Sequence, residues 1–447
     1  NFSKLFSIFV SLLAAFLLMY VYYKSEIIYG GNKIGYYKPY YLIGIILLLL
    51  SFFSFYIKEN FKIIISIIGI SVMLGLYSYE AVLQLGLLNV SRQEIRSNLA
   101  KKLDIKYDDR TRMEVYEELK SIYSENVTLT IHPSQFIDNS YQLFPLSGIS
   151  KIKTIHCNEN GYYSIYNSDQ YGFNNPDTEW NKNYVEYLAI GDSFIHGSCV
   201  NEINTISGNI RKKINNKGII SLGYKGIGPV IQNAILREYG EDIKYKNIIW
   251  FYSGNDIQDL ESELSNEILS KYFNNQKFTQ NLIQKQEIID IQLKDFLNKE
   301  LLNNNKLLNF IKLSNIRKLI YWRDKVEATK SQSKFNLRNF EISMRNSKKI
   351  AERNNANFYF VYCPLINRYN SDTNYSDDDQ FYYEDVMKII EKLEIPIIDL
   401  HKEYFSKIDN PKAKFPFGIW GHYTPEAYEE ISVLVLEKIK KFKENGK

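Results

Sequence analysis

Three long runs of uncharged, mostly apolar residues lie near the start of this 447-residue chain. They cover residues 5–23, 39–57 and 63–79, and the third continues through 81–88 if Glu80 lies at a membrane interface. Each run approaches the ~20 residues that an α-helix needs to cross a bilayer. A signal peptide with core helices and a wholly soluble chain are the alternatives, but the first run ends in bulky residues, Met19–Tyr23, where a signal peptide needs a small-residue cleavage site. The sequence therefore predicts a membrane domain with three transmembrane helices over residues 1–90.

The charges beside these runs do not orient them. If the N-terminus is inside, three lysines lie on the inner side and three lie in the first outer loop. The positive-inside rule therefore favours neither orientation. Three spans place the two chain ends on opposite sides of the membrane. We expect a multi-pass protein of the cell inner membrane, in contact with membrane lipid, whose remaining residues lie on the periplasmic or another extracytoplasmic side.

Charge and cysteine content exclude some classes of function. The net charge is only +4, and the basic residues are scattered among acidic and amide side chains, which does not indicate nucleic-acid binding. Cys157, Cys199 and Cys363 show no CxxC spacing and suggest no metal site. One disulfide with one remaining thiol is possible, and three unpaired cysteines are the alternative. We expect no metal and no other cofactor.

The region between the apolar runs and the C-terminal half divides in two by composition. Residues 92–125 are polar with a helical pattern, which indicates a stalk or juxtamembrane helix. Residues 126–180 are rich in Tyr, Asn, Gly and Pro, which is typical of short strands and turns. We therefore expect a stalk and lead-in over residues 91–183, packed on a main domain over residues 184–447.

Apolar runs alternate with helical stretches throughout that main domain. Near-continuous apolar strands separated by helices predict an α/β fold with a central parallel sheet covered on both faces. A polar, mostly helical insertion at about 260–335 separates the third and fourth strands. It could form a lid over the carboxyl edge of the sheet or a solvated helical pair. The expected strands are 185–190, 218–222, 247–252, 357–363 and 395–400, and the expected helices include 336–354 and 380–393.

Polar motifs follow the first three strands, and a histidine stands near the C-terminus. Ligands of open α/β sheets bind outside the carboxyl ends of the strands, so these motifs are candidates for a site. The strands are followed by Gly191-Asp192-Ser193, by the glycine-rich stretch SLGYKGIGP at 221–229, and by SGNDIQDL at 253–260, which contains Asn255. His422 precedes a helix for which Thr424 is a suitable N-cap and Pro425 a suitable first residue.

The order GDS, a Gly-x-x-Gly turn, GND and a late histidine resembles the SGNH/GDSL hydrolase superfamily over residues 184–442. The preceding segment YGFNNPD resembles the lead-in of its membrane-anchored bacterial members. The resemblance implies a flavodoxin-like, three-layer domain with Ser193 as nucleophile and His422 as the base that takes its proton. It also implies an oxyanion hole formed by the backbone N–H groups of Ser193 and Gly226 and the side-chain amide of Asn255.

One position departs from the superfamily pattern. An aspartate usually stands three residues before the catalytic histidine and orients its imidazole, but Ile419 occupies that position here. Some members use a backbone carbonyl instead, so we expect a Ser193–His422 dyad oriented by the Ile419 carbonyl. A degenerate, non-catalytic domain is the alternative.

Structural roles remain open for several residues in these motifs. Gly223 or Gly228 could replace Gly226 in the oxyanion hole, and Asn255 could be a strand-end cap. Asp192 is expected to hydrogen-bond neighbouring backbone. We expect structural roles for the other acidic and histidine side chains, namely Asp256, His132, His156, His196 and His401.

The resemblance implies a membrane-anchored serine esterase or O-acyltransferase. Such an enzyme would remove or transfer acyl groups, most simply acetyl, on an extracytoplasmic glycan through an acyl-serine intermediate. A transferase would need an acyl-donor membrane partner. The alternatives are a lipase or thioesterase of the same fold and a non-catalytic assembly or binding subunit.

Overall fold

The computed structural model describes residues 2–28, 30–31, 34–86, 91–138, 141–241, 243–303, 306–319, 333–369 and 378–446. The chain forms two compact units. The first consists of Asn1–Asn89 and Lys306–Tyr321, and the second consists of Val90–Asn305 and Trp322–Lys447. The segment expected as one insertion at 260–335 is thus divided between the two units.

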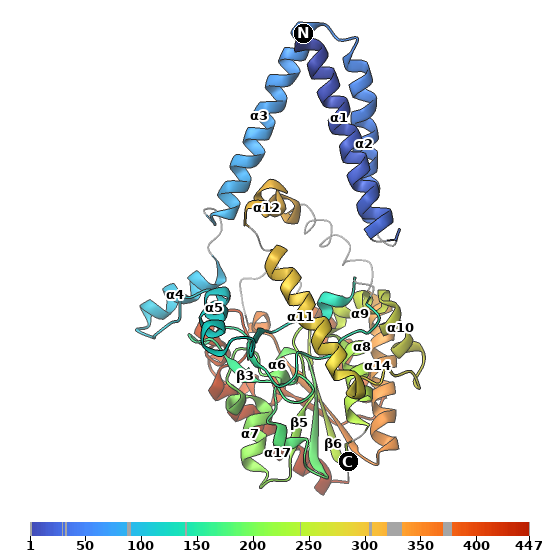
Figure 1. Ribbon diagram of the computed structural model, residues 1–447. Coiled ribbons are helices and arrows are strands. Elements are labelled where there is room, and N and C mark those ends of the chain that lie inside the picture. The colour runs from blue at the N-terminus through green and yellow to red at the C-terminus, as the bar shows by residue number, and fades with distance from the viewer. Residues whose placement is uncertain are drawn as a thin grey trace. The chain divides into compact units, whose positions relative to one another are not determined.

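The first unit contains the three expected apolar helices (Figure 1). They are α1 (Phe2–Tyr22), continued by a π-helical turn (Tyr23–Ile28), α2 (Ile34–Ser54) and α3 (Glu59–Gln84). Each is long and apolar enough to cross a membrane. Most of their large apolar side chains are exposed, as expected for helices that a bilayer would surround. Helix α12 (Lys306–Ile311) packs against α3 in the same unit.

The second unit begins with the stalk and lead-in. Helix α4 (Arg92–Lys102) starts where the Ser91 side chain accepts a hydrogen bond from the N–H of Glu94. Helix α5 (Arg112–Tyr123) starts with a capping box between Thr111 and Glu114. A three-stranded sheet follows in the order β1-β2-β3, with β1 and β2 parallel and β2 and β3 antiparallel. Its strands are β1 (Val127–Leu129), β2 (Lys153–Ile155) and β3 (Ile165–Asn167).

The main sheet has five parallel strands in the order β5-β4-β6-β7-β8. They are β4 (Val185–Gly191), β5 (Ile219–Ser221), β6 (Tyr245–Ser253), β7 (Asn357–Cys363) and β8 (Ile397–Asp399). Counted from β4, this is the flavodoxin-like order 2-1-3-4-5, in which the strand order reverses between β4 and β6. The predicted fold class, a flavodoxin-like α/β domain behind three N-terminal apolar helices, is confirmed.

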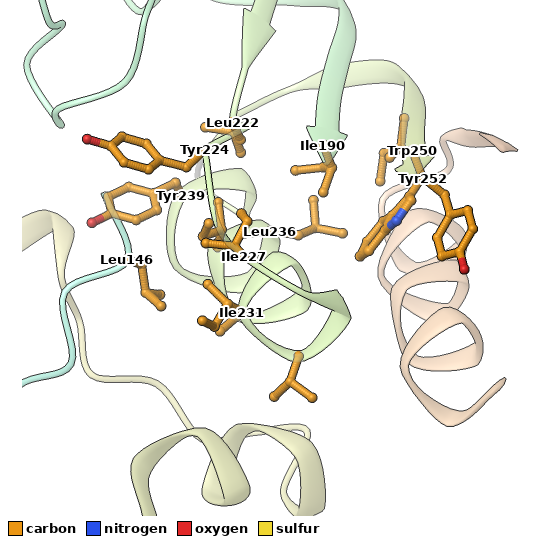
Figure 2. Close-up of a cluster of buried hydrophobic side chains, with 14 of the residues drawn as sticks. Leu146, Ile190, Leu222, Tyr224, Ile227, Ile231, Leu236, Tyr239, Trp250 and Tyr252 are labelled. Atoms are coloured by element: carbon orange, nitrogen blue, oxygen red, sulfur yellow. The ribbon is translucent and has the colours of Figure 1, made fainter. Parts of the chain in front are cut away.

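Helices cover both faces of this sheet (Figure 1). Alternate residues of β4 point to opposite faces, so Leu188 and Ile190 join one buried cluster and Tyr187 and Ala189 join the other. Figure 2 shows Ile231 and Leu236 of α8 (Pro229–Gly240) among the side chains of the first cluster. The other helices are α6 (Ser193–His196), α7 (Ile206–Lys213), α9 (Asp256–Ser265), α10 (Glu267–Asn274), α11 (Gln286–Asn303), α14 (Ser333–Arg353), α15 (Asp378–Lys392), α16 (Leu400–Glu403) and α17 (Pro425–Glu444).

Short 3₁₀ helices connect these elements. They are Pro133–Phe136, Asp177–Glu179, Glu202–Asn204, Ile283–Lys285, Ile366–Tyr369, Phe405–Lys407, Pro411–Lys414 and Pro416–Gly418. The lead-in is bound tightly to the main sheet. Asn175 exchanges hydrogen bonds with the backbone of Ser221, and Asn174 donates to the carbonyl of His196. The segment YGFNNPD therefore braces β5 and the turn that carries Ser193.

Candidate active site

Ser193 lies directly after β4, at the carboxyl edge of the main sheet. Gly191 ends the strand with a φ of +149°, and a Cβ there would lie 2.3 Å from the carbonyl oxygen of Phe251. Only glycine allows β4 and β6 to approach so closely at this point. Ser193 is the first residue of α6, and its backbone N–H has no acceptor among the described residues. That N–H is available to an anion.

Gly226 and Asn255 reach the same place from the neighbouring strands. Gly226 lies between β5 and α8, with a φ of +73°, and Asn255 is two residues beyond the end of β6. The gap between the ends of β4 and β6 is the point where the strand order reverses, which is where α/β sheets bind ligands. The structure thus brings Ser193, Gly226 and Asn255 together at the topological switch point.

Asp192 connects these three residues. Its Oδ1 accepts the N–H groups of Gly226 (2.6 Å) and Ile227 (3.3 Å), and its Oδ2 accepts from the amide of Asn255 (3.2 Å) and the hydroxyl of Ser193 (3.4 Å). Burial raises the pKa of the Asp192 carboxyl, and these hydrogen bonds oppose that rise. Asp192 therefore accepts hydrogen bonds from the donors that the family resemblance assigns to an oxyanion. It also makes the hydrogen bonds to neighbouring backbone that were expected for it.

The backbone N–H groups of the two alternative glycines, Gly223 and Gly228, donate to other acceptors. The N–H of Gly223 donates to the hydroxyl of Ser221, and the N–H of Gly228 donates to the buried carboxylate of Glu263. Of the three glycines considered, Gly226 is the one whose N–H faces the Ser193 turn.

His422 lies at the same edge of the sheet. The hydroxyl of Tyr423 donates to the carbonyl of Pro364 (2.9 Å), the residue that follows β7. The His422 ring packs edge-on against the ring of Phe194, with centroids 5.1 Å apart. Thr424 caps α17, and Pro425 is its first residue, as predicted. His422 and Ser193 both lie in the described part of the chain, and no hydrogen bond joins their side chains there.

The group that orients His422 is a carboxylate, and the prediction of an Ile419 carbonyl is wrong. Oε2 of Glu159 accepts hydrogen bonds from Nδ1 (3.0 Å) and from the backbone N–H (2.7 Å) of His422. Because a carboxylate accepts and does not donate, Nδ1 carries the proton and Nε2 of the neutral ring is the basic atom. Glu159 is 263 residues from His422 in sequence, in the loop between β2 and β3.

Arg96 of α4 supports this carboxylate. Its guanidinium lies 3.5 Å from Oε1 of Glu159 and donates to the carbonyl of Trp420 (2.9 Å), so it contacts both the acid and the histidine loop. Burial would raise the pKa of Glu159, but the hydrogen bonds and charge of His422, with the charge of Arg96, lower it to about 2. Glu159 is therefore ionised at neutral pH.

A disulfide joins the Glu159 loop to the segment that follows Ser193. Cys157 and Cys199 are bonded, and the buried Cys363 is outside the disulfide, so the open question of cysteine pairing is answered. The amide of Asn160 also donates to the carbonyl of Cys199 (3.1 Å). The acid's loop is thus fastened covalently within six residues of the candidate nucleophile.

Ligand atoms of Glu159, Cys199 and His422 lie within 4.8 Å of one another. Metal sites that use cysteine require a thiolate, and the sulfur of Cys199 is in the disulfide. These residues fit an acid–base pair beside a disulfide better than a metal centre.

The remaining histidines bond or pack against groups of the surrounding fold. His196 is fully buried, accepts from the N–H of Lys225 (3.1 Å) and hydrogen-bonds Tyr166 (3.2 Å). The ring of His156 packs beside it at a tilt of 36°, and burial lowers the pKa of both imidazoles well below the usual value. Burial also lowers the pKa of His132 to about 3. His401 hydrogen-bonds the hydroxyl of Tyr369. Asp256 accepts hydrogen bonds from the side chains of Gln232 and Ser253.

No protein-family model matches the chain, and no curated protein matches it in sequence. Among solved structures, it is similar to that of a protein assigned to the lipolytic G-D-S-L family from Desulfitobacterium hafniense DCB-2. That similarity has 11% identity, covers 57% of this chain and 99% of the other, and has a TM-score of 0.33. A second solved structure has 12% identity over 58% of this chain and 97% of the other, with a TM-score of 0.29. At these values the function must be argued from the site itself.

Sequence reasoning missed Glu159, Arg96 and the disulfide. The expectation placed the orienting group at the Ile419 carbonyl, close to His422 in the sequence, whereas the structure places a carboxylate of the lead-in there. The signal was the position of Glu159 two residues after Cys157, with Cys199 six residues after Ser193. Pairing these two cysteines would have brought an acid beside the nucleophile turn.

Proposed function

We propose that this protein is a membrane-anchored serine esterase or O-acyltransferase of the SGNH/GDSL type that acts on an extracytoplasmic glycan. The observation that carries the proposal is the pair Glu159–His422 at the same sheet edge as Ser193 and its N–H and amide donors. A serine hydroxyl needs a base to become a nucleophile, and an imidazole held at Nδ1 by a carboxylate is the common solution. Glu159 supplies the carboxylate whose absence favoured a degenerate domain, so a catalytic role is the better conclusion.

The reaction follows from these groups. Nε2 of His422 takes the proton of the Ser193 hydroxyl as Oγ bonds to the ester carbonyl carbon, and the carbonyl oxygen becomes an oxyanion. The backbone N–H of Ser193 is open to that oxygen, and Gly226 and Asn255 transfer or share the hydrogen bonds that they now give to Asp192. The leaving alkoxide takes the proton from His422, and the acyl-serine is resolved by water or by a sugar hydroxyl.

A groove lined in part by residues 160–162, which follow Glu159 in the sequence, supports a carbohydrate substrate. It has a volume of about 770 Å³, and its lining residues include the aromatic Tyr107 and Tyr162 and the polar Asp109, Arg110 and Asn160. The hydroxyl of Tyr107 is buried without a hydrogen-bond partner among the described residues. Flat rings and nearby polar groups suit the faces and hydroxyls of sugars, whereas a deep aliphatic channel would suit a lipid chain.

The disulfide supports an extracytoplasmic location for the second unit. Disulfides persist in oxidising compartments such as the periplasm and are rare in the reducing cytosol. Cys157, Cys199 and Ser193 belong to one unit, and three membrane-length helices of the described residues belong to the other. These facts favour a membrane-anchored enzyme with its active site outside the cytoplasm.

The test is hydrolysis of small acetyl esters by the full chain in detergent, with the Ser193→Ala variant beside it. We expect Ser193→Ala to reduce kcat/KM at least about a thousandfold, because a nucleophile has no substitute. An acetylated oligosaccharide and a long-chain acyl ester should then be compared. Preference for the oligosaccharide supports the glycan substrate, and preference for the long chain would favour a lipase. Equal activity of parent and Ser193→Ala on all three would contradict the enzyme proposal.

A further inference from the structure

The carboxylate of Glu80, near the end of the membrane-length helix α3, is fully buried. Its Oε1 accepts hydrogen bonds from the backbone N–H (2.9 Å) and the side-chain amide (3.0 Å) of Asn315, and its Oε2 accepts from the N–H of Ile316 (3.0 Å). Residues 314–319 are helical, so Glu80 satisfies N–H groups in the first turn of that short helix. An acidic side chain on an apolar helix thus fastens a segment from far along the chain.

Tyr77 makes a second contact with the same segment, one turn before Glu80. Its hydroxyl donates to the carbonyl of Ile311 (3.1 Å), and its ring lies 5.3 Å from that of Phe310. Both contacts are within the first unit. Residues 306–319, which form α12 and the helical turn after it, are therefore held along the C-terminal end of α3.

Residues 306–319 combine basic and apolar side chains. The segment reads KLLNFIKLSNIRKL, with four basic residues, no acidic residue and seven apolar side chains. Ile311 is 55% exposed and Leu319 is 45% exposed, comparable with the outward-facing Ile70 of α3 at 61%. Short helices with outward apolar residues and basic neighbours are typical of the boundary between lipid headgroups and acyl chains.

We propose that residues 306–319 are a lipid-binding element that lies in the interface of the bilayer crossed by α3. Ile311 and Leu319 contact the acyl chains, and Lys312 and Lys318 face the headgroups. This inference rests on the membrane anchor of the proposed function. Lipid is the occupant because the segment continues the exposed apolar surface of α3, which the bilayer itself covers. The catalytic unit is then attached to the membrane twice, through α1–α3 and through a loop between β6 and β7.

Fluorescence quenching by nitroxide-labelled lipids tests this proposal in the full chain reconstituted into phospholipid vesicles. Three matched isoleucines are replaced one at a time: Ile311→Cys in the segment, Ile70→Cys in α3 and Ile291→Cys in α11, where Ile291 is 57% exposed. The native cysteines do not compete for the fluorophore, because two form the disulfide and Cys363 is buried. Leu319→Cys provides a second position in the segment.

We expect a roughly twofold or greater loss of fluorescence at Ile311→Cys and Leu319→Cys with nitroxides near the headgroup end of the acyl chain. Ile70→Cys should be quenched most by nitroxides near the bilayer centre, and Ile291→Cys by neither probe. If both segment positions behave like Ile291→Cys while Ile70→Cys is quenched, the interfacial element is overturned and the membrane anchor stands. If Ile70→Cys also escapes quenching, the anchor of the proposed function fails together with this inference.

Discussion

The carboxyl edge of the main sheet and the lead-in segment both contribute to the candidate site, but by different means. Ser193 and Asn255 each stand two residues after the end of a strand, and the two strands are neighbours, so the sheet's topology brings them together. Glu159 stands in a turn of the separate three-stranded sheet and reaches His422 through the Cys157–Cys199 disulfide and Arg96. The difference shows that a nucleophile and its anion donors can be encoded locally while the orienting acid depends on long-range packing.

The sharpest test of this comparison is Glu159→Gln. We expect kcat/KM to fall by about 10³–10⁴-fold, because an amide neither stabilises the imidazolium nor enforces the Nδ1–H tautomer. Steady-state hydrolysis of an acetyl ester measures the loss. Glu426→Gln is the control, since Glu426 is exposed in the first turn of α17, four residues after His422, and should leave activity unchanged. Equal activity of the two variants would show that Glu159, and with it the lead-in, does not contribute to catalysis.

Asn255→Ala tests the contribution of the sheet edge. Loss of one oxyanion donor should lower kcat by about 10²–10³-fold, because the donor acts on charge that develops in the transition state. KM should change little. The exposed Asn274→Ala is the matched control. An effect confined to KM would instead make Asn255 a substrate-binding residue or a strand-end cap.

Arg96→Met tests whether α4 acts through Glu159. We expect about a tenfold loss of kcat/KM through a misplaced acid, with substantial recovery in Arg96→Lys. The pKa of Glu159 is about 2 in the folded protein, against 4.5 for the free side chain. Glu159 therefore stabilises the fold fully above pH 4.5 and loses this contribution as pH falls through 2.

Removing Arg96 removes one cause that lowers the pKa of Glu159, so the carboxyl takes up its proton at a higher pH. Acid unfolding of the full chain in detergent, followed by tryptophan fluorescence, should then begin at a higher pH in Arg96→Met than in the parent. An unchanged acid-unfolding curve together with full activity would show that α4 does not position the acid.

Ile419→Ala should have the smallest effect, a change of less than about twofold in kcat/KM, because Glu159 already occupies Nδ1. For the same reason, Ile419→Asp should not raise turnover. The same ester assay measures both variants. A large loss of kcat/KM in Ile419→Ala would indicate that the loop before His422, and not the lead-in, orients the imidazole. The contrast between the two regions would then not hold.

The sequence by itself determined the elements whose patterns are local. Continuous apolar runs identified three membrane-length helices and five buried strands, and turn residues after those strands marked Ser193, Gly226 and Asn255. A cap signal at Thr424 located the helix behind His422. Each of these features depends on neighbours a few residues apart, because strand ends, turns and caps are set by local backbone geometry.

Only the tertiary structure decided the acid, the disulfide and the position of residues 306–319. A carboxylate orients an imidazole through one hydrogen bond of ordinary length, so any acidic residue that packing brings close will serve, here across 263 positions. Glu80 likewise reaches Asn315 across 235 positions. Such contacts have no period and no fixed spacing. They are specified by the packing of whole elements, which a single sequence does not display.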